Sequence, residues 1–196
     1  DEDTDLPLAG ITIADVDANP NPVQVTLAAT NGVLTLNPAN LTFTAGDGSA
    51  DSTITFTGTL AAIAAALATL VYRGNANYNG TDTITVTIDD LGNTGGGALT
   101  TTKNIAVTIN PINDAPIITI PLDQSVNEDT NLTISGISIS DADVGNGIVE
   151  VSLSVAQGVL TLGSLNGLSF ITGDGTADST LVFRGTLAAV NAALNN

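Results

Sequence analysis

The segment Asn110-Pro111-Ile112-Asn113-Asp114-Ala115-Pro116 lies between two alternating runs of β-branched residues and organises the chain. The run before it ends in Ile105-Ala106-Val107-Thr108-Ile109, and the run after it begins with Ile117-Ile118-Thr119-Ile120. Each proline fixes its own φ and favours an extended conformation in the preceding residue. We therefore interpret residues 110–116 as a stiff, extended joint between two domains.

The two sides of this joint are copies of one repeated unit. The interval is 126 residues from Glu2 to Glu128 and 127 residues from Gly46 to Gly173, which implies one inserted residue in the second copy. The repeated motifs are Glu2-Asp3-Thr4 and Glu128-Asp129-Thr130, Gly10-Ile11-Thr12-Ile13 and Gly136-Ile137-Ser138-Ile139, Gly32-Val33-Leu34-Thr35-Leu36 and Gly158-Val159-Leu160-Thr161-Leu162, and Gly58-Thr59-Leu60-Ala61-Ala62 and Gly185-Thr186-Leu187-Ala188-Ala189. The domains are thus predicted at residues 1–112 and 113–196.

Neither copy is whole within these boundaries. The second copy has a leading strand, about residues 117–126, which the first copy lacks. The first copy has a tail, about residues 71–109, which the second copy lacks. A truncated sheet exposes an unpaired edge. We therefore expect self-association through these incomplete sheets, in addition to contacts with neighbouring repeats of the same protein.

The residue pattern predicts an all-β fold. Short alternating segments, separated by Asn-Gly and Gly-Asp-Gly turns, are expected as strands at residues 8–14, 23–29, 33–36, 41–44, 52–57, 81–88 and 99–109. Residues 59–70 differ, because leucines and isoleucine recur there at helical spacing after Thr59, a candidate cap. We predict tandem immunoglobulin-like Greek-key β-sandwiches, each with a short helix that corresponds to residues 59–70.

The composition excludes several classes of partner. The chain has 3 Lys and Arg against 20 Asp and Glu, a formal net charge of -17. This charge opposes binding to nucleic acids and to anionic membranes. No run reaches the ~18 apolar residues of a membrane-spanning helix, so membrane insertion is not expected. Without Cys no disulfide can brace the loops, and a metal ion is the obvious alternative clamp.

Oxygen-bearing side chains gather in the sequence near the joint and near the ends of predicted strands. Calcium takes six to eight oxygen ligands in flexible geometry, and we predict a calcium site from these residues. Magnesium demands stricter octahedra, and zinc would need His or Cys, which the chain lacks. The candidate ligands are Asp141, Asp143, Asp114, Asn113, Asp89, Asp90 and Glu128.

Turn capping is the alternative for these acids, because Asp side chains often accept hydrogen bonds from nearby backbone N–H groups. The same alternative applies to Asp47 and Asp51, which flank glycines at residues 46–48 and could hold an ion or form a hairpin turn. For these two residues we favour the turn.

Catalysis is not expected. The chain has no His and no Cys, so the common pairs of nucleophile and base are missing. A carboxylate pair could act on glycosidic bonds, but aromatic residues that could line a cleft are few. The four phenylalanines occupy repeat-equivalent, alternating positions, which predicts that they belong to the core: Phe43, Phe56, Phe170 and Phe183.

The combined motifs resemble the cadherin-like tandem repeats of large bacterial surface proteins and adhesins over essentially the whole chain. The motifs that carry the resemblance are Asn113-Asp114-Ala115-Pro116, Glu128-Asp129-Thr130, Asp141-Ala142-Asp143, Tyr78-Asn79-Gly80-Thr81-Asp82 and Asp89-Asp90-Leu91-Gly92-Asn93. The resemblance implies sandwiches repeated end to end with calcium at their junctions. By resemblance, residues 113 and 114 match linker ligands, residues 141 and 143 the paired aspartates, and residue 128 the glutamate near the first strand. Ala115 departs from the family pattern, which has Asn there.

We therefore expect a calcium-binding extracellular repeat module of a bacterial adhesin or surface stalk, secreted or held at the cell surface. Calcium would rigidify the joint for cell adhesion, and the partner would be a cell-surface protein or a glycan. Two alternatives stay open. One is a carbohydrate- or ligand-binding module that uses the loops from Tyr72 to Tyr78, and the other is a calcium-independent structural spacer.

Overall fold

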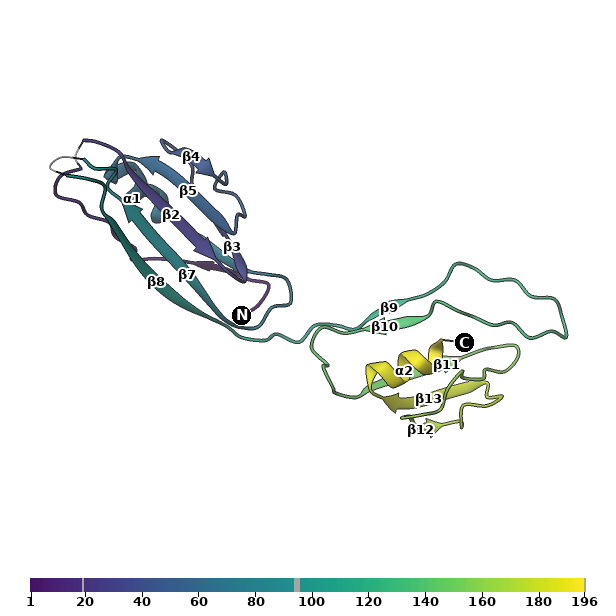
Figure 1. Ribbon diagram of the computed structural model, residues 1–196. Helices are drawn as coiled ribbons and strands as arrows, with labels where there is room; N and C mark the ends of the chain where they lie inside the picture. Colours follow the sequence, from purple (N-terminus) through teal and green to yellow (C-terminus); the bar gives the residue numbers. More distant parts are fainter. Residues whose placement is uncertain (19, 94–95, 196) are drawn as a thin grey trace. The chain divides into compact units, whose positions relative to one another are not determined.

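The structure is a computed structural model that describes residues 1–18, 20–93 and 96–195 (Figure 1). These residues form antiparallel β-sheets and two short helices, so the prediction of an all-β chain is confirmed. The chain separates into two compact units, unit 1 (residues 1–112) and unit 2 (residues 113–196).

Unit 1 contains two antiparallel sheets. One sheet has the strand order β1-β6-β3, and the other has the order β4-β5-β2-β7-β8. Strand β2 lies inside the larger sheet, because it pairs with β5 on one side and with β7 on the other. The elements are β1 (Asp5–Pro7), β2 (Val23–Ala29), β3 (Gly32–Thr35), β4 (Thr42–Ala45), β5 (Thr53–Gly58), α1 (Leu60–Leu67), β6 (Val71–Gly74), β7 (Gly80–Asp89) and β8 (Thr100–Ile109).

One hydrophobic core joins the two sheets of unit 1. Successive side chains of a strand point to opposite faces, and the apolar positions of β2 and β5 alternate accordingly. Val25 and Phe56 are fully buried from the larger sheet, while Leu34 and Tyr72 reach the same core from the smaller sheet. The ring of Phe43 packs at 5.7 Å, centroid to centroid, on the ring of Phe56. Both phenylalanines therefore belong to this core, as the repeat pattern predicted.

Helix α1 lies where the sequence predicted a helix. Its N-terminus is capped by Thr59, whose side chain accepts a hydrogen bond of 3.3 Å from the N–H of Ala62. The helix buries Ile63 and Leu67 against the core, as their spacing of four residues on one helix face requires. Most of this helix's stability therefore comes from packing, because eight residues are too few for a stable helix in isolation.

Unit 2 repeats part of this arrangement. Its larger sheet has the order β11-β13-β12, and a small second sheet pairs β9 with β10. The Asn191 side chain bonds both the N–H and the carbonyl of Ile139, each at 2.8 Å, and so ties α2 to β10. The elements are β9 (Ile117–Thr119), β10 (Ser138–Ser140), β11 (Val149–Ser154), β12 (Ser169–Thr172), β13 (Thr180–Gly185) and α2 (Leu187–Leu194).

The register of unit 2 reproduces that of unit 1. Val25 of β2 lies opposite Phe56 of β5, and the repeat-equivalent Val151 of β11 lies opposite Phe183 of β13. Thr186 caps α2 through a bond from the Ala189 N–H, as Thr59 caps α1. The paired strands and the helix caps of the two units therefore use equivalent residues.

Two predicted strands are wrong. Residues 8–14 are not a strand, because Gly10 adopts a φ of +82°, outside the extended region; β1 instead covers Asp5–Pro7. The leading strand predicted at residues 117–126 is limited to Ile117–Thr119. Pro121 follows closely, and a proline has no N–H to donate to a sheet. Within the described residues, no helix has the length and apolar character needed to cross a membrane.

Candidate functional site

Asp141, the first candidate ligand, shapes its own turn. Its Oδ1 accepts hydrogen bonds from the backbone N–H of Asp143 at 3.0 Å and of Val144 at 2.8 Å. The repeat-equivalent Asp15 does the same with the N–H groups of Asp17 and Ala18, at 2.8 and 3.0 Å. A carboxylate that bonds the backbone two and three residues ahead stabilises a turn. One oxygen of each aspartate is therefore committed to its loop.

The structure brings three of the predicted ligands together in unit 2. The Asp143 carboxylate accepts a hydrogen bond from the N–H of Asp114, and Asp143 also donates its N–H to Asp141. The Asn113 side chain donates to the carbonyl of Asp114 at 3.1 Å. Glu128 lies in the exposed loop between β9 and β10. Asp141, Asp143 and Asp114 are thus linked in one chain of hydrogen bonds, in which each carboxylate of Asp141 and Asp143 accepts from a backbone N–H.

Asp89 and Asp90 belong to unit 1, at the end of β7. Asp89 accepts from the Leu91 N–H at 2.7 Å, and Asp90 accepts from the N–H groups of Gly92 and Leu99 at 2.8 and 2.7 Å. The bonds from Leu99 and Gly92 hold the pKa of Asp90 below its usual value. Asp90 lines a hollow of about 390 Å³ together with Asp15 and Asp17, a grouping that the sequence analysis did not predict.

Calcium binding at these residues stays a prediction. Among the residues that the structure describes, no group of three or more acidic side chains is placed to hold a metal ion. Asp89, Asp90 and Asp141 instead accept hydrogen bonds from backbone N–H groups of their own loops, as the turn-capping alternative requires. Asp51 follows the same rule, because its Oδ2 accepts from the N–H groups of Asp47 and Gly48 at 2.9 and 3.0 Å.

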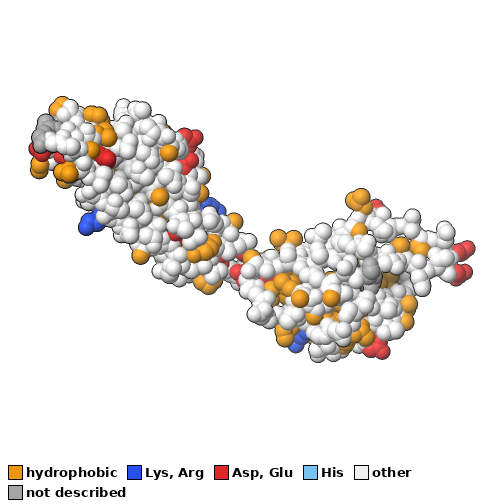
Figure 2. Space-filling model, in the orientation of Figure 1, with side chains coloured by type: hydrophobic (Ala, Val, Ile, Leu, Met, Phe, Trp, Pro, Cys, Tyr) orange, Lys and Arg blue, Asp and Glu red, His pale blue; other side chains and the backbone are white. Residues whose placement is uncertain are grey.

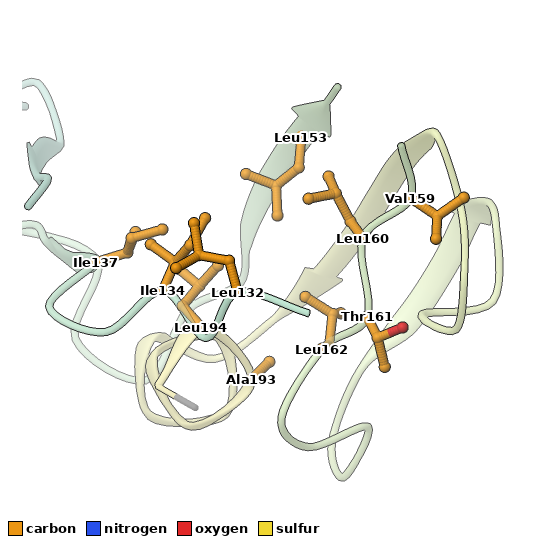
Figure 3. Close-up of a pocket in the computed structure, with 10 residues that line it drawn as sticks. All are labelled: Leu132, Ile134, Ile137, Leu153, Val159, Leu160, Thr161, Leu162, Ala193 and Leu194. Atoms are coloured by element: carbon orange, nitrogen blue, oxygen red, sulfur yellow. The ribbon is translucent and has the colours of Figure 1, made fainter. Parts of the chain in front are cut away.

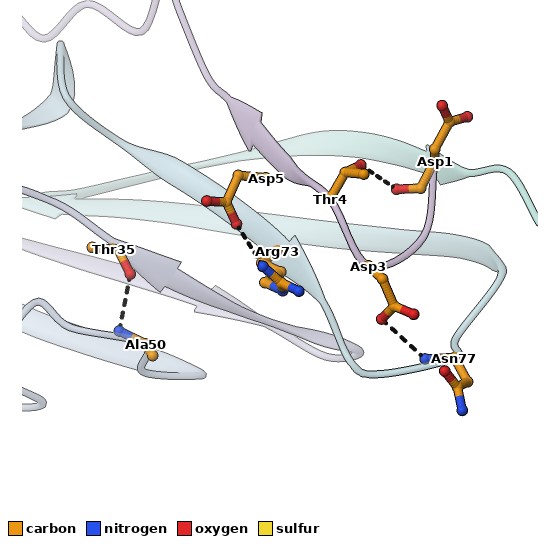
Figure 4. A network of polar contacts seen from close by, with 8 residues as sticks. All are labelled: Asp1, Asp3, Thr4, Asp5, Thr35, Ala50, Arg73 and Asn77. Atoms are coloured by element: carbon orange, nitrogen blue, oxygen red, sulfur yellow. Dashed lines mark hydrogen bonds and ion pairs between the residues drawn. The ribbon is translucent and has the colours of Figure 1, made fainter. Parts of the chain in front are cut away.

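The first residues of unit 1 are held by polar contacts (Figure 4). The Arg73 guanidinium lies 3.4 Å from Asp5 across the β1–β6 pair, and the Asn77 N–H donates to Asp3 at 3.3 Å. Both side chains of the Asp5–Arg73 pair are more than half exposed. Exposed ion pairs contribute little to stability, so these contacts mainly position the segment.

A buried polar network of unit 1 centres on Asp82, which is only 4% exposed. Its carboxylate accepts hydrogen bonds from the Tyr72 hydroxyl at 2.8 Å and from the N–H groups of Thr30, Asn31 and Thr83 at 3.2, 3.0 and 2.7 Å. Burial disfavours the charge, but these four donors outweigh it and lower the pKa of Asp82. Burial and the bond to Asp82 raise the pKa of Tyr72.

The position of Asp82 in the alternating pattern of β7 already indicated that its side chain faces the core. Asp82 shares the parity of Ile84, Val86 and Ile88 in β7, so it faces the same side of the strand as those apolar residues. A carboxylate at an inward position must find donors, because a buried, unsatisfied charge is costly. The buried Tyr72 is one of these donors, and it is 2% exposed. The loop from Tyr72 to Tyr78 therefore does not present Tyr72 as a platform for a sugar.

The network predicts acid sensitivity in unit 1. A carboxylate whose pKa is lowered by folding adds stability above its unfolded pKa, about 3.9, and loses that contribution as pH falls through the folded pKa. We expect the free energy of unfolding of unit 1 to fall below about pH 4, and to fall less steeply in Asp82→Asn. Urea titrations at pH 7 to 3, followed by tyrosine fluorescence, measure this, since both tyrosines lie in unit 1. Asp123→Asn, at an exposed position, should keep the wild-type slope.

Glu2 is the other buried acid, at 2% exposure. Its Oε1 accepts from the Ile112 N–H at 2.8 Å, and its own N–H donates to the carbonyl of Asn110 at 2.9 Å. Its Oε2 has no hydrogen-bond partner among the described residues. Glu2 therefore fastens the first and last residues of unit 1 to each other. Its repeat counterpart Glu128 is exposed and does not have this role.

Unit 2 carries an apolar hollow of about 100 Å³ beside α2 (Figure 3). Its lining comes from the segments around β10 and β11, from residues 159–162 and from the end of α2: Leu132, Ile134, Ile137, Leu153, Val159, Leu160, Thr161, Leu162, Ala193 and Leu194. Hydrophobic side chains also gather on the face of unit 2 that Figure 2 shows. Of these ten lining side chains, only that of Thr161 is polar.

One family model matches the chain. It is the Protein GAMETE EXPRESSED 2 domain, over residues 8–94. Unit 1 is similar to that domain. The matched range lies within unit 1 and holds β2 through β7. Comparisons with curated proteins and with solved structures found no match.

This match corrects the family and the function predicted from the sequence. The resemblance to bacterial cadherin-like repeats is wrong, because the matching family is a different one. The predicted role as a calcium-binding module of a bacterial adhesin, with its cell-adhesion function, is wrong for the same reason. The misleading motifs were short acidic segments, in which Asp89, Asp90 and Asp141 cap turns. Most of these motifs also lie outside the matched residues.

Proposed function

We propose that this chain is a non-catalytic protein-binding module that acts in gametes. The observation that carries the proposal is the match of residues 8–94 to the Protein GAMETE EXPRESSED 2 domain. The polar side chains support a binding role over a catalytic one. The acids that stand out either cap turns, as Asp90 does, or are bonded inside the core, as Asp82 is.

The proposal includes the finer architecture. We infer that each unit is an immunoglobulin-like sandwich, arranged in tandem. Two antiparallel sheets around one core in unit 1 support this, as does the shared register of β2–β5 and β11–β13. Such sandwiches present edges and loops for recognition and have no need of a catalytic centre.

The proposal also includes an extracellular position, either secreted or at the cell surface, where a binding module meets its partners. The formal net charge of -17 fits a module that stays off anionic membrane surfaces. Specificity would then come from local surfaces, because long-range attraction to nucleic acid or lipid is disfavoured.

Antibodies raised against the recombinant chain test this function in the organism that makes it. We expect labelling of intact, unpermeabilised gametes and little labelling of somatic cells. Fluorescent recombinant chain should likewise bind saturably to gametes, and chain unfolded by heat should not. Equal labelling of somatic cells, or labelling only after permeabilisation, would contradict the proposal.

A further inference from the structure

We propose that three asparagines of this chain carry N-linked glycans in the extracellular protein. Each begins the acceptor motif Asn-X-Thr, in which X is any residue except Pro. The motifs are Asn40-Leu41-Thr42, Asn79-Gly80-Thr81 and Asn131-Leu132-Thr133. The inference deepens the proposed function and rests on it only in placing the chain outside the cell, because a chain meets the sugar donor on the secretory route.

The attachment exchanges one bond for another. The donor is an oligosaccharide whose anomeric carbon is activated by a lipid-linked pyrophosphate, and the Asn amide nitrogen attacks that carbon. The bond from nitrogen to the anomeric carbon forms while the bond from that carbon to the pyrophosphate oxygen breaks. The lipid pyrophosphate leaves, and the amide nitrogen gives up one proton to solvent. An oligosaccharyl-transferring enzyme catalyses this step, so the chain contributes the acceptor alone.

The folded chain has to tolerate a bulky, hydrated group at each acceptor. The side chains of Asn40, Asn79 and Asn131 are exposed. Among the residues that the structure describes, these three side chains make no hydrogen bond to the protein. A glycan on any of them therefore displaces water and breaks no contact that holds the fold.

Asparagines that do hold the fold lie outside the motif. Asn31 donates from Nδ2 to the Tyr78 hydroxyl at 3.1 Å, and Gly and Val follow it in the sequence. Asn191 bonds both backbone groups of Ile139, and two alanines follow it. The acceptor motif thus falls on side chains that differ from these in having solvent as their surroundings.

Asn40 stands in the turn that leads into β4. The Leu41 N–H closes this turn on the carbonyl of Pro38 at 3.2 Å, and Asn40 has a φ of +61°. Asn adopts this left-handed conformation more readily than most residues. Thr42 is the exposed first residue of β4, which pairs with β5 alone among the described residues. A glycan at the start of this edge strand hinders its pairing with a strand of another chain.

Asn79 directly precedes β7, and its motif is held from the inner side. The Tyr78 hydroxyl donates to the carbonyl of Thr81 at 2.9 Å and accepts from the Asn31 side chain. Asp82 points into the core, so the preceding Thr81 points outward by the alternation of a strand. The backbone of the motif is therefore fixed, while its Asn and Thr side chains face solvent.

Asn131 gives unit 2 an acceptor at a position that is exposed in both copies. Its repeat equivalent is Asp5 of β1, which pairs with β6 opposite Arg73. The Asp5 side chain is nevertheless 64% exposed. The exposure of this position thus does not depend on an unpaired neighbouring segment.

Mass spectrometry of the secreted chain tests each acceptor separately. The full chain is secreted from cultured eukaryotic cells behind a cleavable signal, and a glycoamidase releases its glycans in heavy-oxygen water. The enzyme turns each glycosylated Asn into Asp with one heavy oxygen, and incubation without enzyme measures spontaneous deamidation. Trypsin then cleaves after Arg73, Lys103 and Arg184, so each acceptor lies in a different peptide. We expect the enzyme-dependent label at all three acceptors.

Matched variants tie the label to the motif. Thr42→Val keeps the branched shape, removes the hydroxyl and should abolish the label at Asn40 alone, whereas Thr42→Ser keeps the motif and should retain it. An acceptor that stays unlabelled in the secreted wild-type chain, or label that persists at Asn40 in Thr42→Val, would overturn the inference. The added signal supplies the secretory route, so unlabelled acceptors contradict this inference alone. Failed labelling of intact gametes would instead contradict the proposed function.

Discussion

Replacing Asp82 with alanine should destabilise unit 1 by about 3 kcal/mol, because it strips the acceptor from several buried donors at once. The Tyr72 hydroxyl and the Thr83 N–H make the shortest of these bonds, at 2.8 and 2.7 Å. An unsatisfied buried donor costs about 1–3 kcal/mol, and water at the partly exposed loop of residues 30 and 31 reduces the total. Urea unfolding at pH 7, followed by tyrosine fluorescence, measures the loss.

Two further variants test whether the stability loss in Asp82→Ala comes from the buried hydrogen bonds. Tyr72→Phe removes one donor and keeps the ring, so it should cost about 1 kcal/mol, with Tyr78 left as the fluorescent probe. Asp123→Ala, at an exposed position in unit 2, should leave the unfolding of unit 1 unchanged. If Asp82→Ala were as stable as Asp123→Ala, the account of Asp82 as the centre of a buried network would be wrong.

The second large effect is a difference in stability loss between the two units when the same Leu→Ala substitution is made at equivalent positions. Leu34→Ala should destabilise unit 1 by about 3 kcal/mol, within the range for fully buried leucines. Leu160→Ala should destabilise unit 2 by only about 1 kcal/mol, because Leu160 lines an open hollow and is already partly solvated. The residues are repeat equivalents, so the chemistry of the substitution is identical.

Native-state amide exchange measures both effects, since unit 2 contains neither Tyr nor Trp. The slowest amides of β5 report unit 1, and those of β13 report unit 2. Equal costs for the two substitutions would contradict the partial burial of Leu160.

Much of the fold was readable from local patterns. The spacing of Leu60, Ile63 and Leu67 after Thr59 predicted the helix, and the alternation of residues 81–88 predicted the core of β7. These patterns succeed because side-chain periodicity and capping act within a few residues. The strand predicted at residues 8–14 was wrong because Gly10 has a positive φ. That backbone conformation depends on the surrounding packing and not on local hydrophobicity.

The candidate site was harder to predict than the fold. Short runs of Asp have two physical uses, binding a cation and accepting backbone N–H bonds, and sequence spacing does not separate them. Asp141 and Asp90 show the second use. Asp82 was missed as a core residue although its parity in β7 was visible. The hollow beside α2 depended on tertiary packing, which local sequence patterns do not specify.

The most direct test of the account is amide hydrogen exchange along the two equivalent strands, β2 and β11, measured by NMR in the full chain. The account predicts strong protection at Gln24, Thr26 and Ala28, whose N–H groups face β7. It predicts fast exchange at their counterparts Glu150, Ser152 and Ser154, with protection kept at Val151 and Leu153, which face β13. Equal protection of the two sets of edge-facing amides would show that β11 is paired on both sides, which would contradict the strand order β11-β13-β12 described for unit 2.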